Sequence, residues 1–157
     1  MELYLVQHGK ATSKEEDPAR PLTAEGRDEV TRVARAAGAQ EVTVGSIHHS
    51  GKLRAQQTAE ILAGELHPDQ APDQLDGLAP NDEPTTAADV IPTLKAPAML
   101  VGHLPHLSRL CSLLVHGDPT REIVAFRMGA IVCLSLDTEG RWRVRWILTP
   151  EVAPPAS

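Results

Sequence analysis

The chain has 157 residues, enough for one domain with one hydrophobic core. Apolar residues make up 41% and charged residues 23%, ordinary values for a globular protein, and with only 3% aromatic residues the core must be aliphatic. The net charge of −6 counts against a general nucleic-acid binder, which normally carries a basic excess. An acidic protein that holds an anion must gather its positive charges at one place.

Neither a targeting segment nor a reactive cysteine pair is indicated. The first residues, MELYLVQHG, lack the basic start and the longer apolar run of a signal peptide, and no window approaches the roughly 18 apolar residues of a membrane span. Cys111 and Cys133 lie in separate apolar stretches, which predicts two buried, reduced thiols and no zinc cluster. We therefore expect a soluble, cytoplasmic protein without membrane contact.

Apolar runs alternate with helical patterns along most of the chain. We predict, in chain order, strands over residues 3–6, 42–47 and 98–101 and helices over residues 23–37, 50–66, 87–94 and 105–115. Thr23 and Ser50 stand where N-caps are expected. Proline, aspartate and glutamine dominate residues 68–84, which predicts a loop.

The chain ends in a predicted hairpin. Strands over residues 130–136 and 142–148 flank Asp137-Thr138-Glu139-Gly140, a plausible turn. Alternation in the second strand places its arginines on one face, which is either solvated or a docking surface for an acidic partner. The other face carries Trp142, Val144, Trp146 and Leu148. Residues 1–150 are predicted to form one domain and residues 151–157 a flexible tail.

This order of elements predicts an α/β fold in which helices cover both faces of a sheet. In open α/β sheets, ligands bind where strands end and helices begin. Polar clusters fall at three such junctions, at residues 7–10, 49–54 and 102–106. We therefore expect the functional site where these junctions meet.

Four segments together are similar to a known family. They are Gln7-His8-Gly9-Lys10-Ala11, Arg20-Pro21-Leu22-Thr23, the run SGKLRAQQT over residues 50–58, and Gly102-His103-Leu104-Pro105. In this order they resemble the histidine phosphatase superfamily, and within it the short SixA-type phosphohistidine phosphatases. The resemblance implies a phosphoglycerate mutase-like, three-layer α/β/α fold with a mixed, mostly parallel sheet. It also implies chemistry without a metal or another cofactor.

The resemblance assigns roles to three residues. His8 would be the nucleophile and become transiently phosphorylated, Arg54 would bind the phosphate, and His103 would contact the phosphoryl oxygens. Phosphoryl transfer needs cations aimed at one point and an in-line nucleophile, and these residue types supply both. Since nearby cations disfavour a protonated imidazole, Arg54 would also keep His8 neutral. Gly9 would let the backbone come close to the ligand.

Gln7 is the main departure from the family, which has arginine at this position of an Arg-His-Gly motif. Glutamine can still bind phosphate as a donor but lacks the charge and the planar fork of arginine. Loss of one preorganised donor has lowered rates by about 10²–10³ in other enzymes. The site must then recruit another cation, with Arg20 the first choice and Lys10 and Lys52 the alternatives. A non-catalytic phosphate-binding module is a further possibility.

The substrate class depends on whether an acid is present. A phosphate ester needs a positioned carboxylic acid, whereas the imidazole of a phosphohistidine leaves readily. Asp82 and Glu83 lie where ester-cleaving relatives carry such an acid, but they also fit two exposed loop carboxylates. A chain of 157 residues has little room for an insertion that covers the site, which favours a phosphohistidine on a partner protein over a small phosphorylated substrate.

We therefore predict a metal-independent phosphohistidine phosphatase. The alternative within the same class is a phosphatase for a small phosphate monoester. The spacing of His103 and His106 suits a metal pair, but no third ligand accompanies them, so no metal site is predicted. The oligomeric state is left open.

Overall fold

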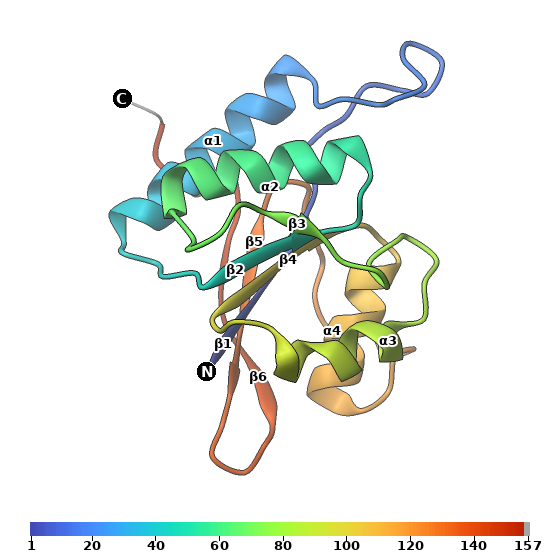
Figure 1. Ribbon diagram of the computed structural model, residues 1–157, viewed down its shortest axis with the longest axis vertical. Helices are drawn as coiled ribbons and strands as arrows, with labels where there is room; N and C mark the ends of the chain where they lie inside the picture. The colour runs from blue at the N-terminus through green and yellow to red at the C-terminus, as the bar shows by residue number, and fades with distance from the viewer. Residues whose placement is uncertain (156–157) are drawn as a thin grey trace.

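The computed structural model describes residues 1–155, in which helices lie on both faces of a six-stranded sheet (Figure 1). The strands are β1 (Glu2–Gln7), β2 (Ser46–His49), β3 (Asp73–Gln74), β4 (Ala98–Gly102), β5 (Ile131–Leu136) and β6 (Trp142–Leu148). The helices are α1 (Ala24–Ala39), α2 (Leu53–Leu66), α3 (Pro84–Val90) and α4 (His106–His116), with a short 3-10 helix, η1 (Ile91–Thr93), after α3. Within residues 1–155, no helix combines the length and apolar character needed to cross a bilayer.

The sheet is mixed and mostly parallel. Its strand order is β3-β2-β4-β1-β5-β6. The strands β3, β2, β4 and β1 are parallel to one another. The last two strands are antiparallel, β5 to β1 and β6 to β5. Figure 1 shows α1 and α2 on one face of the sheet and α3 and α4 on the other. The predicted three-layer α/β/α architecture is therefore confirmed.

The central strand β1 is buried on both faces. Tyr4 and Val6 pack into the cluster formed with α1 and α2, whereas Leu3 and Leu5 pack into the cluster that includes residues of α3 and α4. This alternation follows from the two-residue period of a strand. The predicted inner residues of the first helix are also buried: Val30, Val33, Ala34 and Ala37. Packing on both faces fixes the end of β1, where the sequence places a candidate site.

Several boundaries differ from the prediction. β2 begins at Ser46 instead of residue 42, and α3 covers residues 84–90 instead of 87–94. The strand β3 lies inside the predicted loop, where its two residues pair with His48 and His49 of β2. A strand this short has no alternation that a sequence pattern can reveal.

The two predicted helix caps have different outcomes. Thr23 caps α1 as predicted, because its hydroxyl accepts a hydrogen bond from the Gly26 amide at 2.9 Å. Ser50 does not cap α2, which begins at Leu53 after Lys52, a residue without a side-chain capping bond. The Ser50 hydroxyl lies instead 2.6 Å from Nε2 of a histidine 53 residues further along the chain.

A bulge in the β5–β6 hairpin changes which side chains of β6 lie on the same face of the sheet. The pairing register shifts between Cys133 and Leu134, which leaves Arg145 as an extra residue on β6. As a result Trp142 packs on the side of α3 and α4, and Trp146 packs on the side of α1 and α2. The prediction that these two tryptophans share a face is therefore wrong.

The packed chain continues past residue 150. Glu151 forms an ion pair with Arg127, at 2.8 Å. Ala153 is 6% exposed and belongs to the cluster under α1 and α2. Glu151 and Ala153 of the predicted tail therefore contact the folded chain, residues 156–157 lie outside the described residues, and the domain boundary at residue 150 stays a prediction.

Gly26 provides a test of how closely α1 packs on the loop after β1. A Cβ at Gly26 would lie 2.2 Å from the Lys10 carbonyl oxygen, so Gly26→Ala should lower the free energy of unfolding by about 1–3 kcal/mol. Gly64→Ala in α2 is the matched control, because a Cβ there meets no atom within 4 Å. It should raise the free energy of unfolding by about 0.5–1 kcal/mol. Urea denaturation measures both, and an unchanged stability for Gly26→Ala would contradict the close packing.

Candidate active site

The parallel strands bring the three predicted junctions to one edge of the sheet. Gln7 of β1 pairs with Gly102 of β4, and His49 of β2 pairs with Val101 of β4. The carboxyl ends of these neighbouring strands therefore lie side by side. The residues that directly follow them are His8, Ser50 and His103.

His8 is buried, and a hydrogen bond fixes its ring. Its Nδ1 lies 2.7 Å from the carbonyl oxygen of Gly9. A carbonyl oxygen only accepts hydrogen bonds, so Nδ1 carries the proton. In the neutral ring Nε2 then keeps its lone pair, as a nucleophile requires.

Gly9 contributes to the packing of α1 against the end of β1. Its amide donates to Thr58 Oγ1 at 3.0 Å, and a Cβ at this position would lie 2.7 Å from Cγ2 of Val30 in α1. The amide is therefore already engaged, and the missing side chain leaves room for α1. The prediction that Gly9 lets the backbone come close to the ligand stays a prediction.

His103 faces His8 across the site. The ring centroids are 4.9 Å apart, with the planes tilted by 51°. His103 is 2% exposed, and its Nε2 lies 2.6 Å from Ser50 Oγ. Its Nδ1 is buried without a hydrogen-bond partner in the part of the chain that the structure describes. Sequence reasoning missed this contact of Ser50, and the only signal for it was the position of Ser50 directly after a strand.

Two guanidinium groups act on these histidines. Arg54 lowers the pKa of both His8 and His103, and Arg20 lowers the pKa of His8. Within residues 1–155, neither arginine forms an ion pair with a carboxylate. Arg54 Nε is buried without a partner, while Arg20 Nε donates to the Thr12 carbonyl at 3.1 Å. Two guanidinium groups that lie together without a carboxylate partner, in a chain with net negative charge, are suited to bind an anion.

Only one of the two alternative lysines is near the site. Lys52 lowers the pKa of His103. Lys10 instead pairs with Glu25 at 2.7 Å and lies 3.8 Å from Glu29, so its charge is compensated elsewhere. The cations around the histidines are therefore Arg20, Lys52 and Arg54.

Burial keeps both imidazoles neutral. Desolvation is the main cause that lowers the pKa of His8 to about 4; the hydrogen bond to the Gly9 carbonyl opposes it, and Arg54 and Arg20 lower the pKa further by smaller amounts. Desolvation likewise lowers the pKa of His103 to about 3, assisted by the neighbouring positive groups. The predicted influence of Arg54 has the right direction, but burial is the larger cause.

Gln7 stands at the end of β1 next to His8. Its backbone carbonyl accepts a hydrogen bond from the Gly129 amide at 2.9 Å, and its side-chain Oε1 is buried without a partner in the described part of the chain. A neutral amide therefore occupies the position where the family has a guanidinium. Arg20 remains the first choice to supply that charge, since it acts on both His8 and Arg54.

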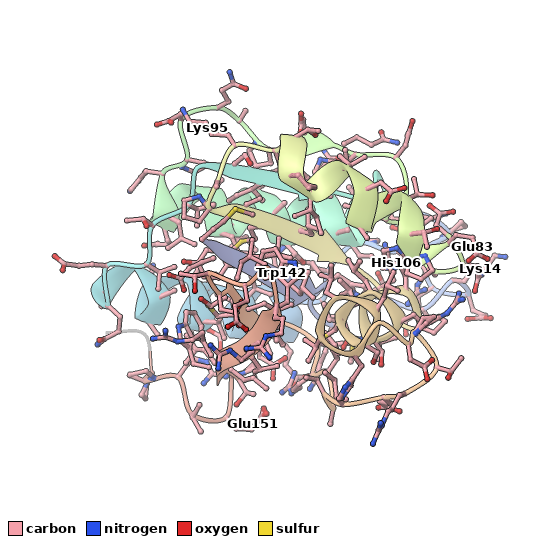
Figure 2. All side chains as sticks on the ribbon, turned by 90° about the horizontal axis from the view of Figure 1, so that it is seen from below. Lys14, Glu83, Lys95, His106, Trp142 and Glu151 are labelled. Atoms are coloured by element: carbon pink, nitrogen blue, oxygen red, sulfur yellow. The ribbon has the colours of Figure 1, made fainter. Side chains whose placement is uncertain are left out.

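A cavity of about 560 Å³ adjoins the site at Ser50 and Lys52. Asp82 and Glu83 both contribute to its lining. Neither carboxylate forms a hydrogen bond with His8, Arg54 or His103 within residues 1–155; Asp82 instead accepts from the Ala79 amide at 3.0 Å. Figure 2 shows Glu83 and His106 toward the same end of the molecule. The structure thus brings both candidate acids beside the site, but not into contact with its histidines.

His106 does not join His103 in a metal site. His106 is fully buried. Burial lowers the pKa of His106, and the nearby Asp82 raises it by a smaller amount. Over residues 1–155, no three histidine, cysteine or carboxylate side chains gather in a way that could hold a metal ion.

Known proteins with related sequences place this chain in a family. The sequence model of the histidine phosphatase superfamily (branch 1) matches residues 3–79. The chain is also 27% identical over 155 residues to the phosphohistidine phosphatase SixA of Escherichia coli (strain K12), a match that covers 96% of this chain and 94% of SixA. The protein belongs to the histidine phosphatase superfamily.

Two further matches also cover most of the chain. The solved structure of the protein histidine phosphatase SixA complexed with tungstate matches with a TM-score of 0.84 and 27% identity, covering 96% of this chain and 97% of that one. An uncharacterized protein of Picosynechococcus sp. is 33% identical over 141 residues, which cover 83% of each chain. The predicted phosphoglycerate mutase-like fold is thereby confirmed.

The neutral state of His8 can be tested directly. An NMR titration of its ring should give a midpoint near 4, well below the ordinary 6.5. Arg54→Gln should raise this midpoint, whereas the control Arg145→Gln on β6 should leave it unchanged. Because the unfolded chain binds more protons than the native protein between these pH values, the free energy of unfolding should fall as the pH drops from 6.5 toward 4. A midpoint at or above 6.5 would show that the ring is not desolvated as described.

Proposed function

We propose that this protein hydrolyses phosphohistidine on a partner protein through a phosphorylated His8 intermediate. The observation that carries the proposal is the pairing of a neutral His8, whose Nε2 is free, with guanidinium groups that have no carboxylate partner in the described chain. The relative SixA supports it, since that protein is a phosphohistidine phosphatase and its structure holds tungstate. Tungstate is a tetrahedral oxyanion like phosphate.

In the first step His8 attacks phosphorus. The lone pair of Nε2 forms a bond to phosphorus while the bond from phosphorus to the substrate imidazole breaks. The departing imidazole takes the electron pair and accepts a proton from solvent. Arg54, Arg20 and His103 hold the phosphoryl oxygens, and their fixed positions stabilise the charge spread over these oxygens in the transition state.

In the second step water attacks the phosphorylated His8. A bond from the water oxygen to phosphorus forms as the bond from phosphorus to Nε2 breaks, which releases inorganic phosphate and restores the free histidine. The Gly9 carbonyl keeps a proton on Nδ1 throughout. The ring therefore leaves phosphorus as neutral imidazole, a much better leaving group than an imidazole anion.

A substrate on a partner protein suits the connections around the site. No helix intervenes between β1 and α1 or between β3 and α3. These connections therefore add loops and no further helix beside the site. A histidine that projects from another protein's surface fits such a site better than a metabolite that must be enclosed.

Trapping the intermediate tests the proposal. After brief reaction with a phosphohistidine-bearing protein, mass spectrometry of an alkaline digest should locate an acid-labile phosphoryl group on His8. His8→Ala should abolish turnover, and Arg54→Ala should lower kcat/KM by about 10²–10³-fold. His116→Ala, at the exposed end of α4, is the control and should retain the label. Turnover with the label on another residue, or without any label, would contradict the mechanism.

Gln7 allows the charge balance of the site to be measured. Gln7→Arg adds a guanidinium at the family position and should raise kcat/KM toward phosphohistidine by about tenfold or more. Gln7→Lys adds the same charge without the planar fork and should give a smaller gain. If Gln7→Arg creates activity where the natural chain has none, the natural chain is a non-catalytic phosphate-binding module. An unchanged robust rate would mean that Arg20, Lys52 and Arg54 already balance the substrate.

A phosphate monoesterase is the second candidate, because Asp82 and Glu83 line the adjoining cavity. For phosphohistidine cleavage we expect Asp82→Ala and Glu83→Ala to change kcat/KM by less than about threefold, since a general acid contributes about 10²–10⁴ only where the leaving group needs protonation. Asp89→Ala, exposed on α3, is the matched control. Efficient hydrolysis of p-nitrophenyl phosphate that either change stops would favour the monoesterase.

A further inference from the structure

Ser50 has no part in the mechanism above, although its hydroxyl meets one of the site's histidines. Ser50 Oγ lies 2.6 Å from His103 Nε2. The same oxygen accepts a hydrogen bond from the Lys52 amide at 3.3 Å. The Lys52 amide thus occupies a lone pair of Oγ, and the hydroxyl hydrogen is available for His103.

The two nitrogens of His103 have different surroundings. Nε2 contacts Ser50, whereas Nδ1 is buried and has no partner within residues 1–155. The ring as a whole is 2% exposed and lies beside His8. Since burial keeps this imidazole neutral, only one of its nitrogens carries a proton.

The position of that proton determines what His103 offers to a phosphoryl group. A phosphoryl oxygen accepts hydrogen bonds, so the nitrogen that meets it must carry hydrogen. Ser50 already occupies Nε2, which leaves the unpartnered Nδ1 for the phosphoryl oxygen. If the proton were on Nε2, Nδ1 would present a lone pair to an anion and repel it.

We propose that Ser50 is a positioning residue that holds His103 in the tautomer protonated on Nδ1. The Ser50 hydroxyl donates to Nε2, and Nδ1–H donates to a phosphoryl oxygen. The identity of that acceptor rests on the proposed function. Ser50 itself touches no reacting atom and acts only through His103, as carboxylates that orient a catalytic imidazole do elsewhere.

The tautomer is measured by ¹⁵N NMR of the whole protein without substrate, where the protonated and unprotonated ring nitrogens have distinct chemical shifts. His103→Gln identifies the His103 signals among those of seven histidines. The natural chain should show His103 protonated on Nδ1. Ser50→Ala should shift the population toward Nε2, and Ser50→Thr, which keeps the hydroxyl, should restore it.

Kinetics on phosphohistidine give the second readout. Ser50→Ala should lower kcat by about 10–10²-fold with KM changed less than about threefold, because the lost interaction belongs to the transition state. Ser50→Thr should recover most of this loss. Ser46→Ala is the matched control: the Ser46 hydroxyl lies 2.9 Å from His48 Nε2, at the other end of β2, and its removal should change neither readout.

A proton on Nε2 in the natural chain, or an unchanged tautomer in Ser50→Ala, would overturn this assignment. Its failure is distinct from failure of the proposed function. If His8 is labelled but His103 is protonated on Nε2, only the role of Ser50 falls. If the Nδ1 tautomer depends on Ser50 but His8 is never phosphorylated, the hydroxyl's control of the proton stands and the phosphatase mechanism falls.

Discussion

One hydrogen bond, from His8 Nδ1 to the Gly9 carbonyl, sets the chemistry of the site because it leaves Nε2 as the free nitrogen. Gly9 is itself held through its amide, which donates to Thr58. The Thr58 hydroxyl in turn donates to the Arg54 carbonyl at 2.8 Å. The proposed nucleophile and the proposed phosphate-binding arginine are therefore connected through a single threonine, so that the end of β1 and the start of α2 cannot shift independently.

Burial and charge act on this site in the same direction. Desolvation disfavours a protonated imidazole, and the guanidinium groups add to the effect. A resting site with neutral histidines and uncompensated arginines carries net positive charge inside a protein of charge −6. Burial and, to a smaller extent, repulsion from Arg20 lower the pKa of Arg54, and a phosphoryl anion bound in the proposed mode would relieve that repulsion. Gln7 limits that repulsion by replacing a further guanidinium with a neutral amide.

Much of this arrangement follows from the sequence, because parallel strands that end in polar turns must present those turns at one edge. The elements that escaped prediction depend on tertiary contacts. The partner of Ser50 lies 53 residues away, so local pattern favours the cap that the structure does not contain. The strand β3 exists only through its pairing with β2. The alternation of side chains along β6 holds only in an unbroken register, and the bulge at Arg145 reverses it. The pairing of Lys10 with Glu25 depends on how α1 packs.

The central claim is that one anion site lies between His8 and the guanidinium groups, and a crystal structure with bound tungstate tests it most directly. We predict tungsten in line with His8 Nε2, with tungstate oxygens about 3 Å from Arg54 and from Nδ1 of His103. Arg20 should turn toward the same oxyanion. Tungstate bound elsewhere, for example at the arginines of β6 with the His8 site empty at saturating concentration, would contradict the claim.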